Sequence, residues 1–517
     1  MRRALCHRRP APGEEVGEPR GRELGDEDER DGDDGDGDRE PTELAREPAF
    51  LAGAGQRRKD RDPDRLRCEH DHHEDPVGGE EAIGLVRPAE LACDDHSSER
   101  GDERDHEHRP GGERTAAEGA QAGRVCTLAH RRGSVRTMPN DSLWTGGTLE
   151  DLRREFGDVY DGRTVLVTGA DGFMGSHLTD ALVELGATVH AFVRANSSGA
   201  LNNISHLRER LKVHFADLTD RTSVDYLVRE IRQAADRPFV FHLGAQAHVG
   251  ESWHRPYETV AANVLGTLNL LQAIVDWDLE IEKFDTAGTS EEYGNVQEAV
   301  SHHHDFDDSG GLILHERSPI NPKSIYATSK VAADFLTMNY HDAFGVPGVV
   351  TRMFNNYGPR QNPRYVTGTI VTQALTRENV ELGNLEPMRD FCFCTDGVRG
   401  HLTVAAHGIP GDVYVYGQGE NVSMLEWGEL ILRTGEEHGF WPSGRRLVSV
   451  ESRFRPGASD VLALRVGHEK LTRETGWEPK VRWEEGVLQT IRWYAGNRDR
   501  WIGRVDWLPT GSPLMTK

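Results

Sequence analysis

Two residues four positions apart, Tyr326 and Lys330, have the side chains needed to remove a proton from an alcohol. Residues 324–343 have a helical pattern, and positions four apart on a helix lie on one face. A phenol has an ordinary pKa near ~10, and a neighbouring ammonium group favours its phenolate form. Such a pair is more often structural than catalytic. It indicates a base for alcohol oxidation only where a hydride acceptor binds beside it.

Residues 164–176, reading TVLVTGADGFMGS, predict a site for such an acceptor. A β-branched run leads into Gly169, Gly172 and Gly175, and a helical pattern follows. This strand, glycine turn and helix are typical of dinucleotide binding, because the glycines allow a tight turn, close approach of a pyrophosphate and packing of helix on strand. The alternative is a glycine turn that simply faces solvent.

The following strands predict the remaining cofactor contacts. The strand over residues 188–193 ends at Arg194, where a cation favours the 2′-phosphate of NADP over NAD. Asp217 follows the next strand and is placed to meet the adenine edge. Small residues after the strand over 239–243 leave room for a cofactor beside the sheet. The expected cofactor-binding residues are Gly169, Gly172, Phe173, Met174, Gly175, Arg194, Asp217, Leu218, Leu243, Ala245, Gln246, Tyr326 and Lys330.

Strands alternate with helices from residue 138 onwards, which predicts an α/β fold with a doubly wound parallel (Rossmann) sheet. We expect this domain to span 138–360, with its last sheet strand at about 349–354. A smaller α/β substrate lobe follows over 361–517. Residues 1–137 lack any sustained hydrophobic period, so we expect a long disordered N-terminal extension or, given Met138, an overcalled start.

Composition excludes several classes of function. The 517 residues carry a net charge of −25, which argues against nucleic-acid binding, because phosphate contacts need clustered cations. The six cysteines form no C-x-x-C pair, and the histidine clusters at 70–73 and 302–304 lack a complete ligand set, so we expect no metal site. Reduced thiols suit a cytoplasmic protein. No apolar run approaches the ~20 residues of a membrane span, so we expect no membrane partner.

Seven short motifs together carry a family resemblance. They are TGADGFMG at 168–175, DLTD at 217–220, LGAQAHV at 243–249, TSEEYGNVQE at 289–298, YATSK at 326–330, and GNL at 383–385 with RDF at 389–391. They resemble the extended short-chain dehydrogenase/reductase family, also described as NAD(P)-dependent epimerases and dehydratases, over about residues 160–500. Within it the chain is most similar to nucleotide-sugar 4,6-dehydratases, especially the GDP-mannose 4,6-dehydratase type. The segment at 356–361 resembles the thymidine- and uridine-sugar enzymes more, which leaves the nucleotide base and the hexose open.

The resemblance implies a role for each candidate residue. Tyr326 would take the proton of the C4 hydroxyl with Lys330 as electrostatic support, and Thr289 would bond the C4 oxygen. Glu291 would remove the C5 proton while water leaves from C6, and the hydride would return at C6. The expected catalytic residues are thus Thr289, Glu291, Tyr326 and Lys330. The expected substrate-binding residues are Ser290, Asn355, Arg389 and Arg455, with the arginines holding the diphosphate.

Two other functions stay open at this point. A nucleotide-sugar 4-epimerase, for example of the UDP-glucose type, shares the glycine turn, tyrosine and lysine, but typically lacks the acid at the position of Glu291. A cofactor-binding scaffold without turnover is the second alternative, and the intact catalytic set argues against it. The resemblance also implies a homodimer or homotetramer, and a nucleotide-diphosphate sugar as the substrate.

Overall fold

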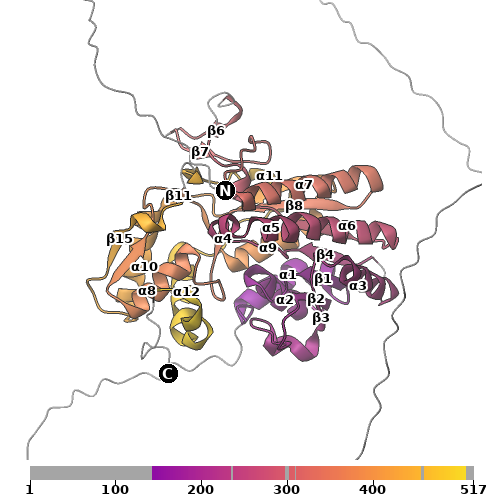
Figure 1. The fold of residues 1–517 in the computed structure, drawn as a ribbon, viewed down its shortest axis with the longest axis horizontal. Helices are drawn as coiled ribbons and strands as arrows, with labels where there is room; N and C mark the ends of the chain where they lie inside the picture. The colour runs from indigo at the N-terminus through magenta and orange to yellow at the C-terminus, as the bar shows by residue number, and fades with distance from the viewer. Residues whose placement is uncertain (1–141, 235–236, 297–301, 309, 456–458, 508–517) are drawn as a thin grey trace, which may run out of the picture. The chain divides into compact units, whose positions relative to one another are not determined.

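The computed structural model describes residues 142–234, 237–296, 302–308, 310–455 and 459–507. The extension predicted over 1–137 and its Met138 boundary lie outside these residues. The described part contains a large sheet, its covering helices and a group of smaller sheets (Figure 1). A short helix, α1 (Gly147–Tyr160), precedes the first strand.

Seven parallel strands form the large sheet, in the order β13-β8-β5-β4-β1-β2-β3. The strand order reverses between β1 and β4, and in open parallel sheets ligands bind at such a point beyond the carboxyl ends of the strands. The predicted doubly wound α/β sheet is therefore confirmed. The strands are β1 (Thr164–Thr168), β2 (Thr188–Arg194), β3 (Lys212–Ala216), β4 (Phe239–His242), β5 (Lys283–Ala287), β8 (Gly348–Met353) and β13 (Val413–Tyr416).

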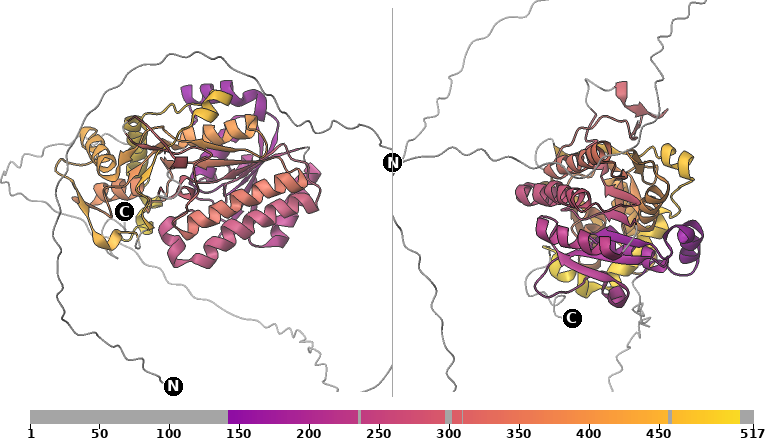
Figure 2. Two further views of the ribbon diagram at one scale, coloured as in Figure 1. Left: turned by 90° about the horizontal axis from the view of Figure 1, so that it is seen from above. Right: turned by 90° about the vertical axis from the view of Figure 1, so that its right-hand side faces the viewer.

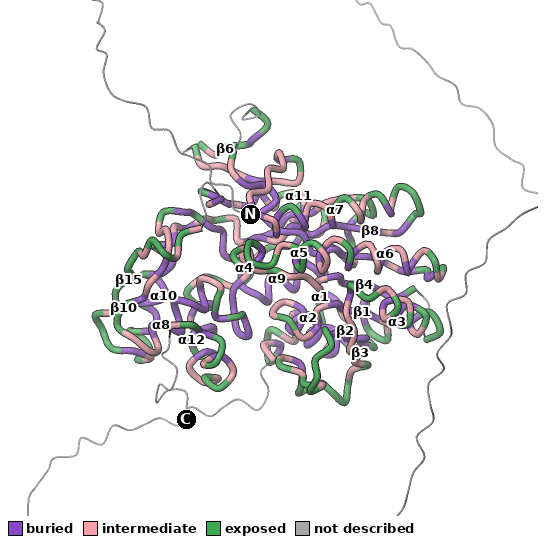
Figure 3. Tube along the Cα trace, viewed as in Figure 1, coloured by how far each residue is buried: buried purple, intermediate pink, exposed green. Residues whose placement is uncertain are grey.

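Helices cover both faces of this sheet because its strands are apolar on both sides. Val165 and Val167 pack in one core with α1, α2 and α9, whereas Leu166 packs in a second core with α3, α6 and α7. Most strands of the sheet are buried, whereas β3 at its edge is only partly so (Figure 3). Figure 2 shows α6 and α7 side by side. The helices are α2 (Phe173–Glu184), α3 (Arg221–Ala234), α6 (Gly266–Asp276), α7 (Ile325–Phe344) and α9 (Cys394–His407).

A third core lies among the elements after β8, around Trp427, Tyr357 and Ile491. It corresponds to the predicted smaller lobe, and β9 (Asn355–Tyr357) pairs there with β12 (Phe391–Phe393). The other elements of this region are α8 (Val366–Thr376), α10 (Met424–Glu437), α12 (Trp483–Gly496), β10 (Asn379–Leu382), β11 (Met388–Arg389), β14 (Val422–Ser423), β15 (Arg446–Ser449) and β16 (Ala463–Leu464).

The chain returns to the large sheet after residue 361. Strand β13 pairs with β8, and α9 packs against α2, so β8 is not the last strand of the sheet as the sequence predicted. Helix α11 (Glu469–Thr475) also packs on β13. The seventh strand is only four residues long and comes after the first lobe elements, which is why alternation did not reveal it. The two parts of the fold therefore alternate along the sequence beyond 360.

Short elements complete the described chain. The segment between β5 and α7 includes the hairpin β6 (Asp305–Phe306) and β7 (Leu312–Ile313). Before α6 lie α4 (Val249–His254), α5 (Pro256–Val260) and a π-helical segment, η2 (Ala261–Leu265). Among the described residues, one helical run, Pro256–Asp276, is long and apolar enough for a membrane span by length and composition. One side of this run packs against α3 and α7. A helix that packs in a protein core meets the same criteria of length and composition.

Candidate active site

The glycine turn joins β1 to α2 and has the geometry predicted for a pyrophosphate site. Gly169 has φ +70°, and a Cβ at Gly175 would lie 2.2 Å from the carbonyl oxygen of Gly169. These positions therefore require glycine. The N-cap of α2 is Gly172, whose lack of a side-chain cap leaves backbone N–H groups available to an anion. Phe173 and Met174 begin the helix and pack against the core of the smaller lobe.

The loop after β4 forms the next part of the predicted cofactor site. Leu243 and Ala245 are half-buried there, and the N–H of Gln246 donates to Asn263 Oδ1 at 2.7 Å. Asn263 also donates to Ser329 Oγ on α7 at 2.8 Å, which ties this loop to the helix of the proposed base. The side-chain oxygen of Gln246 is buried and accepts no hydrogen bond from the described residues, so it fits a ligand donor.

The adenosine end of the predicted site is marked by three residues. Arg194 is exposed at the end of β2, where its guanidinium is free to meet a phosphate group. Asp217 Oδ1 accepts hydrogen bonds from the N–H and hydroxyl of Thr219, at 2.9 and 2.8 Å. Leu218 is buried beside Gly244. Together with the glycine turn and Gln246, these residues fit a dinucleotide.

Tyr326 and Lys330 lie on the first two turns of α7, and both are buried. The helix begins at this point because Ser324 Oγ accepts the N–H of Ala327 at 3.0 Å. The hydroxyl of Thr289 lowers the pKa of the Tyr326 phenol, so the two groups lie close together. The structure thus brings two of the predicted catalytic residues near each other.

The turn after β5 carries Thr289, Ser290 and Glu291, all buried. Thr289 is the N-cap of a short 3₁₀ turn, η3 (Ser290–Glu292), and its hydroxyl accepts the N–H of Glu291 at 3.4 Å. The turn places Glu291 two residues from Thr289, and the charge of Glu291 acts on Tyr326, so the two proposed bases lie near each other beyond the carboxyl end of β5. Ser290 contributes its carbonyl to the N–H of Tyr293 at 3.2 Å.

Two arginines approach this turn from the smaller lobe. Arg455 Nη1 lies 3.4 Å from Glu291 Oε2, and its Nε lies 3.8 Å from Asp460. Arg389 Nη2 lies 4.0 Å from the same aspartate, and its charge acts on Glu291. Asn355 in β9 has a buried side-chain oxygen with no hydrogen-bond partner among the described residues. Of the predicted substrate residues, the two arginines therefore lie beside Glu291.

Among the protein's own groups, the pKa of the Tyr326 phenol is raised rather than lowered. Burial raises the pKa of this phenol, the nearby Tyr365 and the carboxylates of Glu292 and Glu291 raise it further, and the hydrogen bond with Thr289 opposes them. Burial also lowers the pKa of Lys330, against the attraction of Asp334. A tyrosine base at neutral pH therefore needs a further positive charge beside the ring.

The sequence interpretation missed the polar residues beneath this site. Glu292, Asp334 and Arg352 form a buried group, with Arg352 Nε 2.7 Å from Glu292 and 2.9 Å from Asp334. Tyr365, also missed, acts on Tyr326 and donates its hydroxyl to the carbonyl of Ala247 at 2.9 Å. A consecutive pair of glutamates before a tyrosine was the only signal in the sequence, because Asp334 and Arg352 are distant along the chain.

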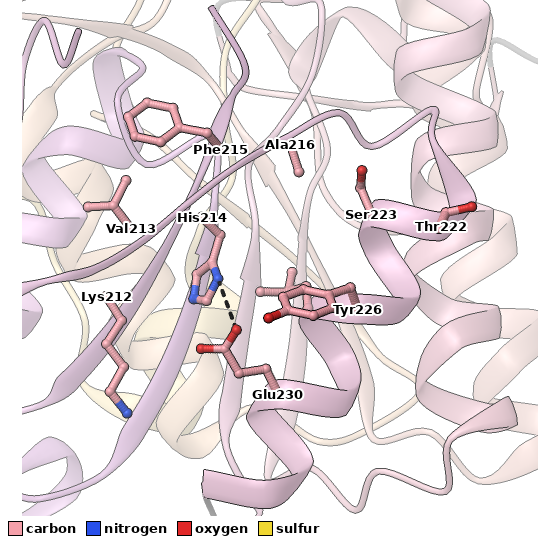
Figure 4. A pocket seen from close by; sticks show the side chains of 10 residues that line it. Lys212, Val213, His214, Phe215, Ala216, Thr222, Ser223, Tyr226 and Glu230 are labelled. Atoms are coloured by element: carbon pink, nitrogen blue, oxygen red, sulfur yellow. Dashed lines mark ion pairs between the residues drawn. The ribbon is translucent and has the colours of Figure 1, made fainter. Parts of the chain in front are cut away.

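A hollow of about 680 Å³ lies elsewhere, over β3 and α3 (Figure 4). Within the described ranges, one group of possible metal ligands occurs beside it: His190, His214 and Glu230. The two imidazole rings lie within 8° of coplanar, with Nδ1 of His190 3.0 Å from Nε2 of His214. These nitrogens face one another as in a hydrogen bond rather than converging on an ion. The predicted lack of a metal site stays a prediction.

The large sheet, the glycine turn and the buried tyrosine and lysine on one helix define an extended short-chain dehydrogenase/reductase. The model of the family described as GDP-mannose 4,6 dehydratase matches residues 166–490. The chain belongs to this family of nucleotide-sugar 4,6-dehydratases.

Known proteins of two activities are similar to the chain. It is 30% identical to the dTDP-D-glucose 4,6-dehydratase of Mus musculus over 346 residues, covering 66% of this chain and 90% of that one. The structure of DesIV, the dTDP-glucose 4,6-dehydratase of Streptomyces venezuelae with NAD and TYD bound, aligns at 28% identity and TM-score 0.57, covering 66% and 100%. A UDP-glucose 4-epimerase of Thermus thermophilus in complex with NAD aligns at 29% and TM-score 0.55, covering 65% and 99%.

Proposed function

We propose that the chain is a nucleotide-sugar 4,6-dehydratase, a lyase that converts an NDP-hexose to an NDP-4-keto-6-deoxyhexose. The observation that carries this proposal is the buried side chain of Glu291, in the same turn as Thr289, whose hydroxyl acts on the phenol of Tyr326. An oxidation at C4 needs one base, whereas a following elimination needs a second. The turn after β5 supplies that second base.

Each step assigns a proton to a residue of this chain. Tyr326 accepts the proton of the C4 hydroxyl, and Thr289 holds the oxygen as C4 becomes a ketone. Glu291 then removes the C5 proton, which the ketone has made acidic, while the C6 hydroxyl takes a proton from Glu291 or solvent and leaves as water. The hydride would return to C6 and a proton to C5, which gives the 4-keto-6-deoxy sugar. Bound nicotinamide dinucleotide supplies the hydride acceptor and donor, and its positive ring adds the charge that Tyr326 needs. Lys330 adds positive charge from one turn further along α7.

Two arginines and an asparagine of the smaller lobe would bind the substrate. Arg389 and Arg455 suit bidentate contacts with a diphosphate, and the unpartnered oxygen of Asn355 suits a sugar hydroxyl. The base and the hexose stay open, because the family model is of the GDP-mannose type, whereas the two dehydratases described above are named for dTDP-glucose.

The experiment that tests this function is product analysis with GDP-mannose, dTDP-glucose and UDP-glucose in turn. We expect at least one to lose the mass of one water and to give a 4-keto sugar, with no net change in NAD(P)H absorbance. An epimer of unchanged mass would instead assign the 4-epimerase alternative. No turnover of any of these sugars, with the cofactor bound, would favour the scaffold.

The cofactor is proposed to be NADP or NAD, with Arg194 favouring NADP because its exposed guanidinium suits a 2′-phosphate. The solved relatives with NAD support the opposite preference. Titration of the chain with both dinucleotides measures the preference. Replacing Arg194 by Asp should weaken NADP binding relative to NAD if the arginine holds the 2′-phosphate.

A homodimer or homotetramer is proposed from apolar side chains exposed on two neighbouring helical runs. Tyr257 is 89% exposed and Leu265 50% on the run Pro256–Asp276, and Phe335 is 54% exposed on α7. A second copy of this face would remove that surface from water. Light scattering after size-exclusion chromatography measures the state, and Phe335→Glu should shift it towards monomer.

A cytoplasmic location is also proposed. Cys392 and Cys394 are free thiols buried within the smaller lobe, as expected in a reducing compartment. Fractionation of cells expressing the tagged full chain would test it, with the enzyme expected in the fraction that holds the nucleotide sugars.

A further inference from the structure

Glu292 is a buried acid that the proposed reaction does not use. Its side chain is fully buried, Oε1 accepts the N–H of Thr289 at 2.8 Å, and Oε2 lies 2.7 Å from Arg352 Nε. A carboxyl group is costly to bury, so each of its contacts must offset lost hydration. The contacts with Thr289 fix the backbone of the turn that carries Glu291.

Glu292 also contacts the helix that carries Tyr326 and Lys330. Asp334 lies one turn beyond Lys330 on α7, and Arg352 Nε lies 2.9 Å from its Oδ2 as well as 2.7 Å from Glu292 Oε2. Two buried carboxyl groups therefore meet at a single guanidinium nitrogen. Two carboxyl groups at one buried site cannot both be charged without a large cost, so one of them retains a proton. The pair therefore shares a proton.

The surroundings favour protonation of this pair. Burial and then the charge of Asp334 raise the pKa of Glu292, while Arg352 and the N–H of Thr289 oppose the rise. Other titratable groups that act on Glu292 or lie next to it in this packing are Lys330 and Tyr326 on α7, Tyr293 in its own turn, and Asp285 on β5, which acts on Lys330.

We propose that Glu292 is a positioning residue: its carboxyl group, joined to Asp334 through a shared proton, holds the turn of Thr289 and Glu291 in register with the helix of Tyr326 and Lys330. This inference rests on the proposed function, because it assigns Glu292 to the spacing of the two proposed bases. Reacting groups misplaced by about 1 Å can lose roughly 100-fold in rate. A bridge of this kind thus acts on kcat rather than on substrate binding.

Two variants of Glu292 test whether its hydrogen-bonding group positions the turn. Glu292→Ala removes the bridge, and we expect kcat to fall by roughly 100-fold with KM little changed. Glu292→Gln still accepts from Thr289, and its amide can donate to Asp334 as the protonated acid does, so it should retain most of kcat. Glu426→Ala is the matched control, because Glu426 forms the same type of cap on α10 in an exposed position. Its kcat should equal that of the wild type.

A second measurement needs no substrate. The shared proton stabilises the fold fully below the ordinary pKa of glutamate, and this contribution is lost as pH rises through the raised folded value. The Tm of the wild type relative to Glu292→Gln should therefore fall with increasing pH, since the amide keeps its proton. A Tm difference that stays constant with pH would overturn the shared proton.

The outcomes distinguish this inference from the proposed function. If the wild type dehydrates no nucleotide sugar, the proposed function fails, and the pH dependence of Tm still tests the bridge. If the wild type is active and Glu292→Ala keeps its kcat, positioning by Glu292 is wrong. Equal losses in kcat for folded Glu292→Ala and Glu292→Gln would also overturn it, because the conservative variant would then fail to rescue.

Discussion

The turn after β5 and the start of α10 use one hydrogen-bonding pattern in two different surroundings. In each, a hydroxyl residue caps the turn, and a glutamate three residues later accepts the N–H of that hydroxyl residue. Thr289 and Glu292 form the first pair, at 2.8 Å. Ser423 and Glu426 form the second, at 3.0 Å. Glu292 is fully buried, whereas Glu426 is exposed.

The surroundings shift the two glutamates in opposite directions. Burial raises the pKa of Glu292. The hydrogen bond with the Ser423 hydroxyl lowers the pKa of Glu426, which keeps its charge in water. The same short pattern thus favours the protonated acid in one place and the carboxylate in the other. Local sequence specifies the cap, and tertiary burial specifies its protonation.

The largest expected effect comes from the residue just before the capping glutamate. This residue is Glu291 in the buried turn and Leu425 in the exposed one. Glu291→Gln should slow elimination by roughly 10²–10⁴-fold, the range of a general base, while C4 oxidation continues. Single-turnover absorbance of NAD(P)H with a substrate sugar measures the oxidation, and mass spectrometry measures the loss of water. Elimination at the wild-type rate in this variant would show that Glu291 is not the C5 base.

Local patterns predicted the elements but not the network beneath the site. The glycine turn and the pair Tyr326 and Lys330 were recognisable because each depends on residues within one strand-to-helix unit. Glu292 meets Arg352 and Asp334 only after β5, β8 and α7 pack together, and no sequence period reports such a contact. The return of β13 to the sheet was missed for the same reason.

The second effect tests how much burial changes the contribution of each turn to the free energy of unfolding. Arg352→Met removes the cation between Glu292 and Asp334 and leaves buried carboxyl groups without it, so we expect a loss of about 3–5 kcal/mol of unfolding free energy. Arg433→Met is the matched control, because Arg433 is exposed on α10, and it should change stability little. Urea unfolding of both variants measures the difference. Equal stability of the two would remove the energetic distinction between the buried and exposed turns.

The third effect concerns Arg455, which contacts Glu291 in the buried turn. If it binds the substrate diphosphate, Arg455→Ala should raise KM by roughly 10- to 100-fold, since a hydrogen bond to a charged group contributes about 1.5–3 kcal/mol. Steady-state kinetics at several salt concentrations measure this change. A lower kcat with an unchanged KM would instead assign Arg455 to the orientation of Glu291.

The smallest effect, on Glu426, completes the contrast because its pH dependence has the opposite sign. A glutamate whose folded pKa is lowered stabilises the protein above its ordinary pKa, and that contribution is lost as pH falls through the lowered value. Glu426→Gln should therefore reduce stability by about 0.5–1 kcal/mol at neutral pH, in the range of a helix cap, and by less in acid. Thermal unfolding across pH measures this stability difference, in parallel with that of Glu292→Gln.

The two stability differences should change with pH in opposite directions. The stability of the wild type relative to Glu426→Gln should increase as pH rises, whereas its stability relative to Glu292→Gln should decrease. Changes in the same direction would mean that burial does not decide the protonation of the cap, and that Glu292 is charged like its exposed counterpart.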